Sequence, residues 1–225
     1  MPAMHAFLAS ALFLAAATCS LRCGSAEPAG DTIVFVGELI SIEGKPDPCE
    51  QRQAEEDASD CISMDALYTA RYRVMERIVG QPPADPLTFS VADHYGFPAF
   101  ARYRHALLFV ALSSDGPWLH KYQAIPVHRT VEGQWASCGD LRRSPADKPS
   151  PQLRALRFER EIAQQTELSD SLLASYRAGK RPELRIEHGK VWCSQGVLLP
   201  DVYEIVRSGV MQARGIPLPA WPGAN

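Results

Sequence analysis

Histidines are the first residues to test for chemistry, because they serve as metal ligands and as acid–base catalysts near neutral pH. Five of them follow residue 26, at positions His94, His105, His120, His128 and His188. No pair is spaced i, i+4, and no His-Glu-x-x-His motif occurs, so the spacing supports no metal or other cofactor. His94 stands between Asp93 and Tyr95, which makes it the most polar histidine cluster and a candidate ligand contact.

Other catalytic motifs are absent from the sequence. The nearest approach to Gly-x-Ser-x-Gly is Cys193-Ser194-Gln195-Gly196, which lacks the leading glycine, and neither a P-loop nor a Gly-x-Gly-x-x-Gly loop occurs. The sequence therefore favours binding over catalysis. Two alternatives remain: a cell-envelope hydrolase whose site is assembled from His94 and acidic residues, and a structural envelope protein.

Arginines are the main positive feature. Arg71, Arg73 and Arg77 alternate with apolar residues and fall on the polar face of one predicted strand, and Arg102 and Arg104 precede another. These side chains predict a cationic stripe that binds an anionic glycan or an acidic protein. The alternative is a solvated face whose arginines pair with the acidic run at residues 55–60. An exported chain of net charge −3 is not expected to bind nucleic acid.

The N-terminus predicts export. Residues 6–17 are an uncharged apolar run, long enough for a signal peptide but shorter than the ~20 residues of a membrane span. We expect residues 1–26 to be the signal peptide, no transmembrane span, and a secreted or periplasmic protein. Cleavage after Ala17 and a lipid anchor at Cys19 are the alternatives.

Cleavage after Ala26 leaves four cysteines, an even number that predicts two disulfides in an oxidising compartment. Three connectivities exist, of which we favour Cys49–Cys61 and Cys138–Cys193. The first closes a polar loop, and the second ties a strand end to a later hairpin. No Cys-x-x-Cys spacing supports a thiol or metal site.

The elements that must position these residues are mostly β. With 225 residues, 46% hydrophobic and 22% charged, the chain has the composition of a globular protein. Apolar or alternating segments predict a barrel or sandwich over residues 30–140, with strands at 32–43, 68–78, 87–91, 106–112, 122–127 and 131–135. Gly37 would permit a bend or bulge in the first strand.

A polar, Pro-rich linker is predicted at residues 141–151, followed by an α-rich extension at 152–225. Apolar spacing predicts helices at 153–162, at 168–176 with Ser169 as N-cap, and at 200–214. A hairpin turning at His188-Gly189 is predicted between the last two helices, and a Pro-rich tail follows them.

The β segments resemble the netrin-like modules of the tissue inhibitor of metalloproteinases family, in the short bacterial secreted version. The residues that carry the resemblance are 34–40, 72–80, 87–91 and 103–111. It covers about half of the chain and implies a five-stranded OB-type barrel that acts as an interaction module or inhibitor. In the animal inhibitors a mature N-terminal cysteine clamps the target's zinc. Here the first cysteine after the expected cleavage site is Cys49, so that mechanism does not carry over unless processing exposes Cys19 or Cys23.

Overall fold

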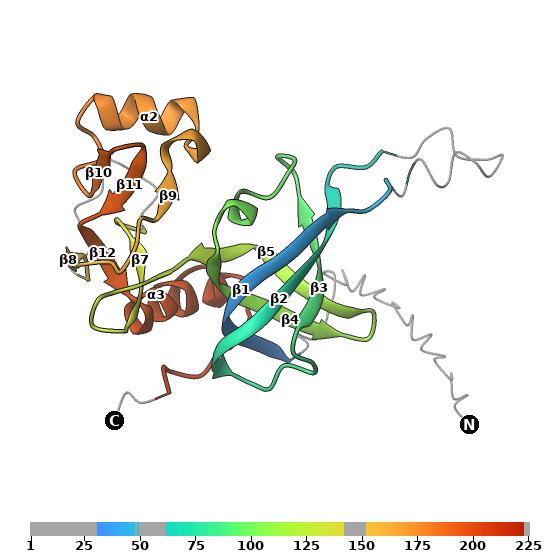
Figure 1. Cartoon of the computed structure of the whole chain (residues 1–225). Coiled ribbons are helices and arrows are strands. Elements are labelled where there is room, and N and C mark those ends of the chain that lie inside the picture. Colours follow the sequence, from blue (N-terminus) through green and yellow to red (C-terminus); the bar gives the residue numbers. More distant parts are fainter. Residues whose placement is uncertain (1–30, 48, 50–61, 142–151, 223–225) are drawn as a thin grey trace, which may run out of the picture.

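The computed structural model describes residues 31–47, 49, 62–141 and 152–222. Five strands form a closed barrel in the order β1-β2-β3-β5-β4, the strand order of an OB-type barrel (Figure 1). All neighbouring pairs are antiparallel except β3 and β5. The expected fold class, a mostly β chain with a five-stranded barrel followed by short helices and strands, is confirmed. The bounds are β1 Thr32–Gly44, β2 Ala66–Val79, β3 Leu87–Asp93, β4 His105–Ser113 and β5 Gly116–Pro126.

Side-chain alternation in β2 separates the barrel interior from solvent. Tyr68, Ala70 and Tyr72 are buried in the barrel core, whereas Arg71 and Arg73 between and beyond them are exposed. Successive side chains of a strand point to opposite faces, so this period-two pattern orients β2. The predicted polar arginine face of this strand is confirmed.

Strands β1 and β4 are buried on both faces. In β1, Ile33 and Phe35 point into the barrel core, and Val34 packs in a second cluster outside it. That outer cluster includes Phe109 of β4, whose ring stacks on Tyr203 of helix α3 (Leu199–Val206) with centroids 6.1 Å apart. The continuous apolar run of β4 therefore reflects contact with α3 outside the barrel as well as with the core inside it. The π-helical turn η3 (Arg207–Met211) extends α3.

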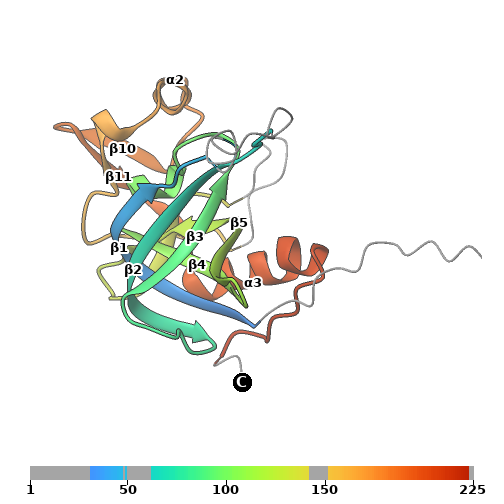
Figure 2. The ribbon, with the colours of Figure 1, turned by 90° about the vertical axis from the view of Figure 1, so that its right-hand side faces the viewer.

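The chain after the barrel forms two small sheets and the helices α2 and α3 (Figures 1 and 2). One sheet has the order β6-β7-β12-β8, and the other β10-β11-β9. Helix α2 (Asp170–Arg177) begins where Ser169 Oγ accepts a hydrogen bond from the amide of Leu172. The remaining bounds are β6 His128–Arg129, β7 Trp135–Cys138, β8 Arg154–Ala155, β9 Ala163–Gln164, β10 Leu184–Glu187, β11 Lys190–Cys193 and β12 Gln195–Leu198, with 3-10 turns η1 Ala99–Arg102 and η2 Gln165–Glu167.

Two predicted elements are wrong. Residues 153–162 form no helix: the chain is extended there, and its amides bond to neighbouring strands, as in Glu159 N–H to the carbonyl of Arg129 at 3.0 Å. Leu156, Phe158 and Ile162 of this segment pack in a small cluster with Cys193. The apolar residues that suggested a helix are therefore buried by an extended segment. Residues 131–134 form a turn through Gly133 (φ +75°) before β7 begins at Trp135.

Three other predicted elements in this region are confirmed. Helix α2 has its predicted N-cap, and β10 and β11 form the hairpin that turns at His188-Gly189. Helix α3 and its extension η3 overlap the predicted third helix but begin one residue earlier, at Leu199. The barrel is shorter than the predicted 30–140 unit, because its last strand ends at Pro126. β7 lies inside that unit in sequence but pairs with β12 of the C-terminal extension. Linker residues 142–151 and the signal peptide lie outside the described residues.

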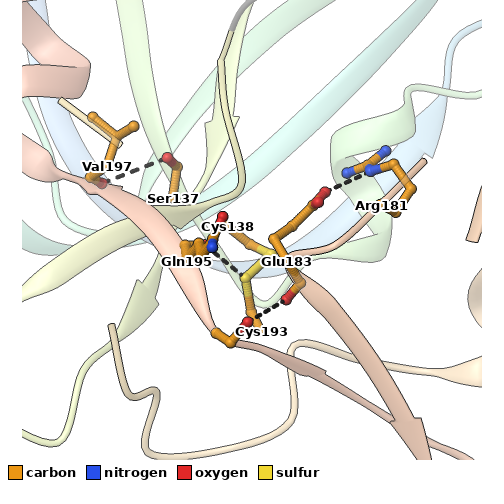
Figure 3. The surroundings of a disulfide bond; sticks show 8 residues. Ser137, Cys138, Arg181, Glu183, Cys193, Gln195 and Val197 are labelled. Carbon is orange, nitrogen blue, oxygen red and sulfur yellow. Dashed lines mark hydrogen bonds and ion pairs between the residues drawn. A yellow bond between two sulfur atoms is a disulfide. The ribbon is translucent and has the colours of Figure 1, made fainter. Parts of the chain in front are cut away.

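A disulfide joins the two small sheets, and it is one of the two predicted pairs. Cys138 ends β7 and Cys193 ends β11, and their sulfurs are bonded with Cα atoms 6.0 Å apart (Figure 3). Beside it, Glu183 is buried and forms an ion pair with Arg181. Cys61 lies outside the described residues, so the Cys49–Cys61 pair stays a prediction.

Close packing across the barrel predicts that Gly37→Ala destabilises the fold. The β1–β2 register shifts at Gly37, and a Cβ there would lie 2.8 Å from Tyr72 Cδ1 and 3.1 Å from Leu108 Cδ1. Overpacking of this kind costs about 1–3 kcal/mol. Urea unfolding should show a free energy of unfolding lower by that amount, seen as a lower midpoint concentration with an unchanged slope.

Tyr72→Phe is the matched control at the same contact. The Tyr72 hydroxyl is buried with no hydrogen-bond partner in the described part of the chain, and its ring stacks on Phe89. Removing a buried unpaired hydroxyl while keeping the ring should leave the free energy of unfolding unchanged or raise it by up to ~1 kcal/mol. Equal losses in both variants would contradict this account of the core.

Candidate functional site

Two of the predicted arginines meet on one carboxylate. Glu38 of β1 lies between β2 and β4, so its ladder partners are Arg73 on one side and His105 on the other. Its Oε2 lies 2.6 Å from Arg73 Nη1, and its Oε1 lies 2.9 Å from Arg104 Nη2. The hydrogen bond from Arg104 lowers the pKa of Glu38. These arginines therefore pair with β1, while the acidic run at 55–60 lies outside the described residues.

The other predicted arginines have separate contacts. Arg77 Nη1 donates to Gln81 Oε1 at 2.6 Å, and Arg102 Nη1 lies 3.5 Å from the carbonyl of Glu167. Arg71 is exposed on β2. Among the described contacts, only Arg73 and Arg104 are joined through a shared partner.

His94 lies just past the end of β3, in a polar cluster of its own. Its Nδ1 is 2.6 Å from the carbonyl oxygen of Met64 and 3.7 Å from Asp65 Oδ1, and Asp65 is also bound by Lys121 Nζ at 2.7 Å. The Tyr95 ring packs against the His94 imidazole. The described contacts of the His94 imidazole come from a main-chain carbonyl, a carboxylate and a tyrosine ring, and none comes from a Ser, Thr or Cys side chain.

A cleft of about 260 Å³ lies where the barrel meets the C-terminal sheets. Of the arginines and histidine predicted to bind a ligand, only Arg104 lines it. The sequence patterns did not indicate this site, because its walls come from β2, the start of β4, β6, β7 and the segment 159–162. The residues that matter for its chemistry are Arg104, Arg129, Arg160, His105, His128 and Trp135.

Strand pairing sets the geometry of the cleft. Arg129 and Trp135 are ladder partners in β6 and β7, which holds the guanidinium carbon 4.0 Å from the centroid of the indole. Trp135 is 4% exposed, and the His105 ring lies 4.9 Å from it, centroid to centroid. The opposite wall is fixed by the amide of Ile162, which donates to the carbonyl of Val191 in β11 at 2.8 Å.

Both imidazoles in the cleft are neutral at pH 7. Burial lowers the pKa of His128 to about 4, and its ring lies 6.4 Å from Tyr103 and 6.0 Å from Phe158, centroid to centroid. Burial also lowers the pKa of His105, and the positive charge of Arg104 lowers it further. A neutral imidazole offers one N–H donor and one nitrogen acceptor. Both rings line the cleft, and no hydrogen bond to either of them is found among the described residues.

Comparisons with protein-family models, with curated proteins and with solved structures give no match to this chain. Across the described ranges, no three His, Cys, Asp or Glu side chains come together in a way that could hold a metal ion. Helices of the described part are all too short or too polar to cross a bilayer.

Burial of His128 predicts a loss of stability in acid. Its folded pKa of about 4 lies below the ordinary histidine value of 6.5, so between these pH values the unfolded chain binds the proton first. The free energy of unfolding should fall through this window by up to ~3 kcal/mol. His128→Phe, which keeps a ring between Tyr103 and Phe158, should flatten the pH dependence of urea unfolding.

His94→Gln is the matched control, since His94 is an exposed histidine outside the cleft. This variant removes a histidine without altering the rings around His128, so it separates the effect of His128 from that of replacing a histidine in general. A His128→Phe curve that falls as steeply as the unaltered protein's between pH 6.5 and 4 would contradict the burial argument.

Proposed function

We propose that this protein is an exported, non-catalytic binding module that recognises an anionic ligand through the cleft between the barrel and the C-terminal sheets. The observation that carries the proposal is the convergence of three guanidinium groups, from Arg104, Arg129 and Arg160, on one concave site. Arginine presents several fixed donors that suit carboxylate and similar groups, and a cleft excludes water better than an open strand face.

Differences among the three arginines support a division of roles. Arg104 is tied to Glu38, and Arg129 is stacked on Trp135 and donates to the carbonyl of Gly133. Both are thereby fixed in position before a ligand arrives. Arg160 is exposed at the rim and has no ion pair or hydrogen bond among the described side chains. It is the arginine most available to a ligand.

The netrin-like resemblance supports an interaction module, and the N-terminal segment supports its export. An OB-type barrel commonly presents a face and its loops to an extended ligand. Export rests on the apolar run at residues 6–17, which the structure does not describe. We therefore propose a secreted or periplasmic interaction module whose ligand belongs to the cell envelope or its surroundings.

Alanine variants of the cleft arginines test this function. The unaltered protein is measured by biolayer interferometry on immobilised alginate, dextran sulfate and poly-L-glutamate. We expect it to bind at least one polymer, and Arg104→Ala and Arg160→Ala each to weaken that binding roughly 10-fold or more, since a charge-assisted hydrogen bond is worth about 1.5–3 kcal/mol.

Arg71→Ala is the matched control, because Arg71 is an exposed arginine of β2 that does not line the cleft. It should change affinity by less than about two-fold, as expected for a distant surface charge at physiological salt. Absence of binding to all three polymers would refute the proposed function. A loss in Arg71→Ala as large as in Arg160→Ala would move the site to the open strand face and contradict the cleft.

A further inference from the structure

The volume of the cleft limits what part of a ligand it takes. At about 260 Å³ it falls just below the range of roughly 300–1,000 Å³ that holds drug-sized ligands. The cleft therefore suits one ring or one side chain of a longer molecule. Its open rim at Arg160 and Glu159, both exposed, leaves room for the rest of a chain to continue outside.

Charges of both signs line the same cleft. Glu159 and Glu161 flank Arg160 in sequence, and all three side chains line the site. Lys190 lies 3.4 Å from Glu161, which keeps that carboxylate in place. A dianionic phosphate or a cluster of sulfates would be repelled by the two carboxylates. A ligand with one carboxylate and several hydroxyl groups would suit both the arginines and the glutamates of the cleft. The arginines would donate to its carboxylate, and the glutamates would accept from its hydroxyls.

The imidazoles favour hydroxyl groups in the same way. His105 and His128 are neutral, so each can accept from one hydroxyl and donate to another. A peptide carboxylate side chain offers the anionic group but lacks these hydroxyls. An acidic sugar fits a site of one-ring size that combines arginines, carboxylates and neutral imidazoles.

We infer that the cleft binds a single uronate residue of an acidic polysaccharide, with the sugar carboxylate on Arg160 and Arg104 and its ring hydroxyls on His105, His128 and Glu161. This inference rests on the proposed function and names the ligand class of the same site. Neighbouring sugars would extend past Glu159 along the rim.

Isothermal titration calorimetry with trigalacturonate tests the inference. The protein is titrated at pH 7 and physiological salt with trigalacturonate, with a neutral galactose trisaccharide, with triglutamate and with inorganic sulfate. We expect trigalacturonate to bind at least 10-fold more tightly than each of the other three. Arg160→Ala should weaken trigalacturonate 10-fold or more, and His105→Phe should weaken it about 5- to 10-fold through lost hydroxyl contacts.

Outcomes of these titrations separate the two proposals. The uronate inference would be overturned if triglutamate or sulfate bound as tightly as trigalacturonate, or more tightly. If that binding were also lost in Arg160→Ala, the cleft would still be an anion site. Equal binding of the neutral trisaccharide would also overturn the uronate, because the carboxylate would then contribute nothing. A failure of every anion to bind would overturn the proposed function as well. Arg160 is exposed, so its variant should keep the unfolding midpoint of the unaltered protein.

Discussion

Pairing of β12 with β7 is the constraint on which the arrangement of this molecule depends. β7 follows the barrel in the chain, and residues 196–198 pair with residues 136–138. β12 leads directly into α3 at Leu199, so the same ladder places that helix against the outer face of β1 and β4. On the other side, Cys138–Cys193 ties β7 to β11, and β11 pairs with β9 and holds Ile162. One ladder and one disulfide thus position helix α3 on the outside of the barrel and the outer wall of the cleft.

The cleft differs from the surfaces around it because two of its three arginines are held in place by neighbouring side chains. Arg129 stacks on its ladder partner Trp135, and Arg104 is held by Glu38, which also binds Arg73. Ordering long arginine side chains before binding reduces the conformational entropy lost when a ligand arrives. The cluster around His94 differs, because its imidazole and Asp65 are engaged by a main-chain carbonyl and by Lys121.

Local patterns in the sequence predicted the barrel well and the cleft poorly. Period-two alternation in β2, the apolar run of β4 and the His188-Gly189 hairpin all reflect short-range rules. The Cys138–Cys193 pair was favoured among three connectivities because it would tie a strand end to a later hairpin. The cleft depends on residues from a segment predicted as a helix, which includes Arg160, and on Trp135 at the end of a segment predicted as a strand. Their proximity is set by pairing between positions tens of residues apart, which no local periodicity encodes. Arg104 was predicted because it stands beside a strand, but its partner Glu38 could be found only from the register.

The most direct test of the central claim is a nuclear magnetic resonance titration with trigalacturonate that follows the indole N–H of Trp135 and the ring nitrogens of the histidines. If the cleft is the binding site, the signals of His105, His128 and Trp135 should shift together and saturate at one ligand per chain, while those of His94 stay unchanged. Shifts confined to His94 and Tyr95, or a saturated complex in which the three cleft residues do not move, would contradict the account.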